Sequence, residues 1–220
     1  MDGTEARARR EPTDKDLTRD EKPKDSFLMK DHSKSTSTSK EASFSNQILK
    51  IMRNKNESMS LSKEARKSID KLIVQIGTEI AKKCNNPEHL TAWNLQSSLT
   101  NILPKSMVKY AIEDGTEAIN NYEKNRTGNK AVRASLNLHP IQCDRILRMC
   151  NPSSKLSKES SVYMAGVLEY IVTEILVLMG NYSRKNSTTK ISLKAFNKVI
   201  EEDEDICELL IINDIDLDLE

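Results

Sequence analysis

Apolar residues recur every three or four positions along two long stretches of the chain, residues 61–80 and 156–175. This spacing places them on one face of a helix. The apolar positions are Ala65, Ile69, Leu72, Ile73, Ile76 and Ile80 in the first stretch, and Met164, Val167, Leu168, Ile171 and Ile175 in the second. Both stretches begin with Leu-Ser-Lys-Glu, in which Ser62 or Ser157 suits a helix N-cap. The pattern predicts long helices over residues 62–84 and 158–180.

The two stretches belong to an internal repeat. Residues 50–80 and 145–175 align without a gap at an offset of 95 positions, and 12 of the 31 pairs are identical. Shorter apolar segments flank each long helix, at 48–52 and 95–103 in the first copy and at 141–149 and 193–200 in the second. The repeat predicts a unit of short, long and short helix that occurs twice. A further amphipathic helix, 104–122, follows only the first unit.

The second long helix is apolar enough to raise the question of a membrane span. Its apolar part, residues 162–179, has about the minimum spanning length and contains Glu169 and Glu174. A helix that is apolar nearly all round must be covered from several sides in a soluble fold. The equivalent helix of the first unit can cover it, so we expect a core helix and no membrane partner.

The composition favours a helical protein with an aliphatic core, because Gly and Pro are few and aromatic residues make up only 4%. The four cysteines lack the spacing of a zinc site or a disulfide framework, which indicates a reducing, intracellular environment and no metal. The first residues do not resemble a secretory signal. The sequence contains no recognisable pairing of a catalytic nucleophile with a base, no phosphate-binding loop and no dinucleotide-binding motif. We therefore expect no cofactor and no enzymatic activity.

Charge divides the chain into regions. Residues 1–42 hold 10 basic and 10 acidic residues, residues 43–200 hold 24 basic and 13 acidic, and residues 201–220 hold 10 acidic and no basic residues. Residues 1–42 lack apolar periodicity, so we expect a disordered arm. We expect folded units at 43–122 and 134–210, a linker at 123–133 and an acidic tail at 211–220. The tail could shield the basic body, bind a partner or simply fray.

Several segments resemble histones. "LTNILPKSMVKYAIEDGTEAINNY" resembles the end of the third helix and the extra C-terminal helix of histone H-two-B. "VYMAGVLEYIVTEILVLMGN", "TTKI" and "EEDEDICELL" resemble the long helix, second loop and acidic turn of histone H-two-A. Their order is similar to that in the fused histone doublets of large DNA viruses of the marseillevirus kind. The resemblance implies an all-α fold of two tandem histone folds, paired as an intramolecular handshake pseudo-dimer, with an extra C-terminal helix on the first.

Basic residues gather at the predicted starts of the long helices, where exposed N–H groups and the helix dipole also favour phosphate. The resemblance implies that paired loops hold the DNA backbone, without reading sequence. The predicted DNA-binding residues are Lys63, Arg66, Lys67, Thr91, Arg145, Arg148, Lys155, Lys158 and Lys190. The alternative is that these side chains only solvate helix surfaces. Gln142 and Lys190 stand where histone H-two-A has arginine, and "NNPEHLT" lacks a basic run. We therefore expect DNA to be held more weakly, or at fewer turns, than by a cellular dimer.

A second predicted site is acidic. The resemblance implies a surface on which arginine-bearing peptides dock, formed by Asp114, Glu169, Glu174, Asp203, Glu204 and Asp205. Ser106 and Val177 depart from the histone pattern at this surface, which predicts weaker binding of basic peptides. The alternative is a solvated acidic helix end.

The main functional hypothesis is a viral structural protein that packages double-stranded DNA into nucleosome-like particles with a second doublet resembling histones H-four and H-three. It implies a location in the host nucleus or viral factory and in the virion. The rival hypothesis is an interaction module that binds histones or chromatin proteins rather than wrapping DNA. It is motivated by the near-neutral net charge, by the missing loop arginines and by "IINDIDLDLE", which stops where histone H-two-A continues into the segment that docks on the other histone pair. A sequence-specific transcription factor is a third alternative that no motif supports.

Overall fold

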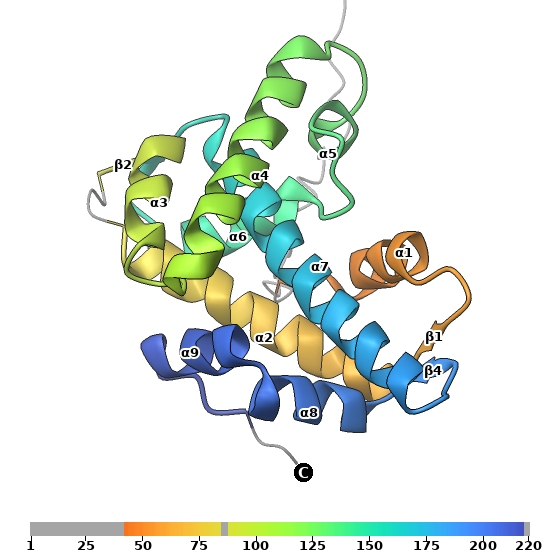
Figure 1. Ribbon diagram of the computed structural model, residues 1–220. Coiled ribbons are helices and arrows are strands. Elements are labelled where there is room, and N and C mark those ends of the chain that lie inside the picture. The colour runs from red at the N-terminus through yellow and green to blue at the C-terminus, as the bar shows by residue number, and fades with distance from the viewer. Residues whose placement is uncertain (1–41, 85–87, 218–220) are drawn as a thin grey trace, which may run out of the picture. The chain divides into compact units, whose positions relative to one another are not determined.

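Two long helices, α2 (Lys63–Lys82) and α7 (Ser160–Lys185), pack against each other at the centre of the fold (Figure 1). The computed structural model describes residues 42–84 and 88–217, so the predicted disordered arm, apart from Ala42, lies outside the described residues. The apolar face of α2 is completely covered, and Ile69, Leu72 and Ile76 are 0% exposed. The two periodic stretches therefore form one shared core.

Shorter helices surround this pair. In the first half they are α1 (Ser45–Lys55), α3 (Ala92–Leu99) and α4 (Lys105–Lys124). In the second half they are α6 (Pro140–Cys150), α8 (Leu193–Glu202) and α9 (Glu204–Ile212). The expected order of short, long and short helix is present in both halves, and α4 is the extra helix expected after the first.

Helix α7 differs from its predicted bounds at both ends. It begins at Ser160 rather than residue 158, although Ser157 Oγ still accepts a hydrogen bond from Ser160 N at 3.2 Å. It continues past Gly180 to Lys185 because Asn56 packs on Gly180 and bonds Arg184 in the added turn (Nη1 to Oδ1, 2.9 Å). By length and composition α7 could cross a membrane, but 67% of its apolar window is buried. This burial agrees with the expected core helix.

Four two-residue strands join the halves at two places. Strand β1 (Ser60–Leu61) pairs in parallel with β4 (Lys190–Ile191). Strand β2 (His89–Leu90) pairs in parallel with β3 (Lys155–Leu156). Each pair therefore joins the loop before one long helix to the loop after the other, as expected for a handshake pseudo-dimer.

Helix α4 lies along α7 with glycines at the closest approach. A Cβ atom at Gly115 would lie 2.7 Å from Cε2 of Tyr163, and one at Gly166 would lie 2.8 Å from the carbonyl oxygen of Asp114. Neither position has room for a larger residue without movement of the neighbouring chain. The glycines thus allow the extra helix of the first half to pack on the long helix of the second.

The segment expected to be a plain linker contains a helical turn, α5 (Lys130–Arg133). The Arg133 guanidinium lies 3.8 Å from the centroid of the Tyr122 ring and donates to the carbonyl oxygens of Tyr122 and Asn125, both at 2.7 Å. Asn125 donates back to the Arg133 carbonyl at 2.9 Å. These contacts attach the connection to the end of α4, and they supply partners for carbonyl groups that have none within the helix.

The described part of the acidic tail also packs on the fold, so it does not fray as one of the expectations held. Asn213 is buried, and its side-chain amide donates to the carbonyl oxygens of Ile102 at 2.7 Å and Leu209 at 2.8 Å. Lys83 Nζ lies 3.2 Å from Asn213 Oδ1. Leu217 is buried as well. The tail therefore crosses to the first half near the end of α2.

Candidate functional site

The pairing of β1 with β4 gathers basic side chains from both halves. Ser60 lies opposite Lys190, and Lys63 begins α2 only three residues after Ser60. The pKa of Glu64 is lowered, chiefly by a backbone hydrogen bond and the Ser62 hydroxyl, and also by the charges of Lys190 and Lys63. Both lysines are exposed. They therefore share one end of the molecule although they are far apart in the sequence.

Two further predicted cations lie on the first turns of α2. Lys67 is exposed and Arg66 is partly buried. Ser62 caps the same helix by accepting a hydrogen bond from Ala65 N at 3.1 Å. The start of α2 thus combines positive side chains with the positive end of the helix dipole.

The pairing of β2 with β3 forms the corresponding end on the other side. His89 lies opposite Lys155, and Lys158 lies two residues before the start of α7 at Ser160. All three side chains are exposed. Thr91 has a different role, because its hydroxyl accepts from Asn94 N at 3.2 Å while its own N–H donates to Asn94 Oδ1 at 3.2 Å. This capping box fixes the start of α3 and leaves Thr91 less available to a ligand.

The two arginines predicted on α6 are exposed but have neighbours on their own helix. Arg148 Nε lies 2.8 Å from Oδ2 of Asp144 in an ion pair. Arg145 Nη1 donates to Gln142 Oε1 at 3.1 Å. Any anion that binds Arg148 has to compete with Asp144.

Three of the six predicted acidic residues, Asp114, Glu174 and Asp205, interact with Tyr170, and a fourth, Asp203, interacts with Glu174. The pKa of Glu174 is raised, chiefly by burial and further by the charges of Asp114, Asp203 and Asp205, against the opposing charge of Lys55. Burial also raises the pKa of Tyr170, as do Glu174, Asp205 and Asp114. Tyr170 stacks on the half-exposed Tyr110, with ring centroids 6.3 Å apart. We call Asp114, Glu174, Asp203 and Asp205 the acidic cluster.

Two members of the acidic cluster also hold helix starts. Asp203 caps α9 by accepting from Ile206 N at 3.1 Å. Asp205 Oδ1 accepts from the Ser106 hydroxyl at 2.5 Å, which joins α9 to the start of α4. Glu204 is exposed in the first turn of α9. The six predicted residues therefore do not form a uniform set.

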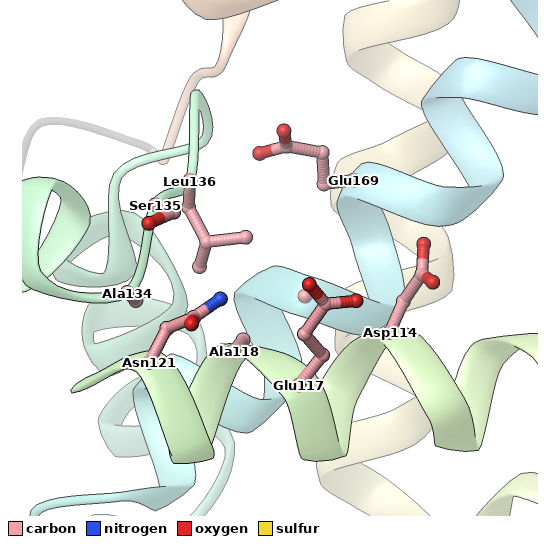
Figure 2. Close-up of a pocket in the computed structure, with 9 residues that line it drawn as sticks. Asp114, Glu117, Ala118, Asn121, Ala134, Ser135, Leu136 and Glu169 are labelled. Atoms are coloured by element: carbon pink, nitrogen blue, oxygen red, sulfur yellow. The ribbon is translucent and has the colours of Figure 1, made fainter. Parts of the chain in front are cut away.

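Glu169 in particular serves the fold. Its carboxylate accepts from the backbone N–H groups of Asn137 at 2.7 Å and Leu138 at 2.8 Å, and from the Asn137 side chain at 2.7 Å. Figure 2 shows Glu169 across a pocket of about 170 Å³ from Asp114 and Glu117 of α4. Glu117 was not predicted, because acidic residues on an exposed helix face carry no distinguishing sequence signal. Its charge contributes, after burial, to the raised pKa of Asp114.

The chain is similar in sequence to one curated protein and in structure to another. No family model matches the chain. It is 28% identical over 102 residues to the histone doublet of the H-two-B and H-two-A type from Melbournevirus. The chain resembles a viral histone doublet. The match covers 45% of this chain and 38% of the relative, so the aligned part spans well under half of that protein.

A solved structure is also similar. The crystal structure of the histone from Methanopyrus kandleri aligns with 71% of this chain and 91% of its own, with a TM-score of 0.47 and 12% identity. The chain has an all-α structure, which is consistent with two tandem histone folds. The helix order and the two strand pairs described above place one histone fold in each half.

The structure adds a basic residue, Lys130, to those predicted from the sequence. Lys130 Nζ donates to the Lys158 carbonyl at 3.2 Å and to the Ser161 hydroxyl at 3.1 Å, so α5 supplies a cation at the start of α7. The polar composition of residues 123–133 predicts only a linker. A capping asparagine, Asn129, which accepts from Val132 N at 3.0 Å, was the available signal for the short helix. Among residues 42–84 and 88–217, no cluster of three or more metal-ligating side chains is present.

Proposed function

We propose that this chain is a viral core-histone-like structural protein that binds duplex DNA without sequence specificity. The observation that carries the proposal is the two strand pairs: β1 with β4 brings Lys190 to the same end as Lys63, and β2 with β3 holds the segment of Lys155 and Lys158 before α7. Each end combines lysines from loops and helix starts with backbone N–H groups that favour phosphate. Contacts of this kind hold the DNA backbone and carry no base information.

The remaining predicted residues extend these two ends. Arg66 and Lys67 lie on α2 behind Lys63, Lys130 adds a cation beside Lys158, and Arg145 and Arg148 line the exposed face of α6. Arg148 contributes less than a free arginine because its bond to Asp144 must be exchanged for one to phosphate. Thr91 contributes chiefly by fixing the start of α3.

The salt dependence of DNA binding tests this proposal. The logarithm of the affinity of the full chain for a random-sequence duplex should fall linearly with the logarithm of salt concentration. The double variant Lys63→Ala, Lys190→Ala should reduce that slope by about two, because each lost phosphate contact reduces it by about one. Lys109→Ala is the matched control, since Lys109 is exposed on α4 beside Tyr110. A slope that is flat, or equal in the double variant and the wild type, would refute binding through these lysines.

A more specific proposal is that the chain packages DNA into nucleosome-like particles with a second doublet resembling histones H-four and H-three. The similarity to the Melbournevirus doublet supports it. It implies work in the viral factory or host nucleus and in the virion. The test is nuclease digestion of DNA assembled with the partner doublet, in which a protected fragment of defined length is expected. A continuous smear of fragments would remove the packaging role.

The acidic cluster favours a second function, the binding of arginine-bearing peptides from histones or chromatin proteins. Asp114, Glu174 and Asp205 come together there next to the exposed Tyr110 ring, which can also accept a guanidinium. Tight histone binding with only millimolar DNA affinity would favour this interaction module over a packaging protein. Glu174→Lys should abolish such binding, while Glu123→Lys, on the exposed end of α4, should not.

A further inference from the structure

An apolar projection stands at the C-terminal end of α9. Ile211 is 79% exposed, the largest exposed fraction among the large apolar side chains of the described residues, and Ile212 beside it is 36% exposed. Glu208 and Asp214 flank the pair and are exposed, and residues 201–217 contain no basic residue. We call Ile211 and Ile212 the knob. It is held firmly, because Lys83 Nζ lies 3.4 Å from the Ile212 carbonyl oxygen and the adjoining Asn213 is buried.

An apolar groove of about 500 Å³ lies beside β1 at a different place on the molecule. Its apolar lining consists of Leu49, Met52, Met59 and Leu61. Arg53 and Glu57 are the charged residues that line it. Methionine side chains adapt readily to the shape of an aliphatic ligand. The groove therefore has the chemistry to take an isoleucine side chain.

The charges around the groove suit an acidic partner. Glu57 is offset by Arg53, and next to the groove the two lysines Lys63 and Lys190 outnumber the one carboxylate between them, Glu64. The knob carries only carboxylates on its own segment. With Lys83 included, the charged residues near the knob are still mostly acidic, so the two apolar surfaces have surroundings of opposite net charge.

The two surfaces cannot meet within one molecule. The groove ends at Leu61, two residues before α2 begins at Lys63, whereas the knob is bonded to Lys83, the C-cap of α2. Helix α2 has 20 residues, which corresponds to a length of about 30 Å at 1.5 Å per residue. Because α2 separates the knob from the groove by this length, the knob of one copy can reach only the groove of another copy.

We propose that the knob of one copy of this chain docks in the groove of a second copy, in a head-to-tail contact. The contact is heterologous, so each bound copy still offers one free knob and one free groove, and association continues into short chains or a ring. One or two side chains bury little area, so the contact is weak and becomes appreciable at chain concentrations on the order of 100 µM. The opposite charges make it sensitive to salt. The proposal does not depend on DNA binding.

Sedimentation equilibrium of the full chain without DNA tests the proposal. We expect the average mass to rise with concentration at about 50 mM salt and to fall towards that of the monomer at about 500 mM salt, where screening is stronger. Ile211→Asp and Arg53→Glu should each weaken association at least tenfold. The matched controls Val132→Asp and Lys50→Glu, both at exposed positions outside the knob and groove, should associate as the wild type does. A wild-type chain that stays monomeric at these concentrations would overturn the proposal.

Mixing the two variants distinguishes a head-to-tail contact from a symmetric one. Ile211→Asp retains an intact groove and Arg53→Glu retains an intact knob, so an equimolar mixture should form dimers that neither variant forms alone. A mixture that remains monomeric while the wild type associates would show a different contact. Circular dichroism of both variants checks that they fold, which is expected because both side chains are exposed.

Discussion

The carboxylate of Glu169 accepts a 2.7 Å hydrogen bond from the backbone N–H of Asn137 and another of the same length from the Asn137 side chain. These bonds attach the segment before α6 to the middle of α7. A carboxylate that the histone resemblance places on a protein-binding surface is therefore committed to the fold. Replacing Glu169 should therefore change the stability of the fold more than it changes the binding of peptides.

Glu169→Ala should lower the free energy of unfolding by about 2 kcal/mol or more, because it removes three hydrogen bonds to a charged acceptor. Glu169→Gln should lower it less, since the amide oxygen can still accept. Urea denaturation at neutral pH measures both changes. Glu204→Ala is the control, because Glu204 is exposed and makes no such bonds to the residues that the structure describes. An equal loss in that variant would contradict the assignment.

Gly115→Ala should destabilise the protein by about 1–3 kcal/mol, because the new Cβ would lie 2.7 Å from the Tyr163 ring. Thermal and urea unfolding should both report the loss. Tyr163→Leu in the same chain should recover part of it by removing the ring that clashes. The loss in the double variant is compared with the sum of the losses in Gly115→Ala and Tyr163→Leu measured separately. If the two values are equal, the ring is not the source of the strain.

Tyr163→Phe should leave stability unchanged or raise it slightly. The Tyr163 hydroxyl is buried and finds no hydrogen-bond partner among the described residues, so its removal relieves an unpaired polar group. Burial raises the pKa of this hydroxyl, so it should also fail to titrate with the exposed tyrosines in an alkaline absorbance titration. A loss above about 1 kcal/mol would indicate a lost hydrogen bond.

Glu174→Gln should stabilise the protein at pH 7. Burial and neighbouring carboxylates raise the pKa of Glu174 above its ordinary value of 4.5, so its ionisation is less favourable in the folded than in the unfolded state. Stability contributed by the protonated form is present below pH 4.5 and is lost as pH rises through the folded pKa. The advantage of the glutamine should therefore vanish when unfolding is compared below that pH. A difference that is constant with pH would exclude a titration effect.

Asn213→Ala should destabilise the protein by about 1–3 kcal/mol, because it leaves the Ile102 carbonyl without this donor and removes a contact to Lys83. Chemical denaturation gives the magnitude. Asp216→Asn, at an exposed position of the same tail, should change stability little. Equal unfolding free energies for Asn213→Ala and the wild type would show that the tail is not held at this point.

Helical periodicity determined most of the architecture from the sequence alone. The helices α1, α2, α3, α4, α6 and α8 lie within a few residues of the predicted segments, because an amphipathic pattern is a local property of each segment. The internal repeat predicted two equivalent halves, and the shared core of α2 and α7 follows from their apolar faces. The basic and acidic residues of the two candidate sites could also be predicted, since charge is unevenly distributed along the sequence.

The tertiary structure alone decided which of these charges act together. Lys63 and Lys190 become neighbours only when β1 pairs with β4, and neither local sequence specifies that partner. Glu169 and Glu174 are five residues apart on one helix, yet the first is bonded to the backbone of Asn137 and the second interacts with Asp114 and Asp205. The difference arises because hydrogen-bond partners and burial depend on segments brought from elsewhere in the chain, whereas helical periodicity depends only on neighbours in sequence.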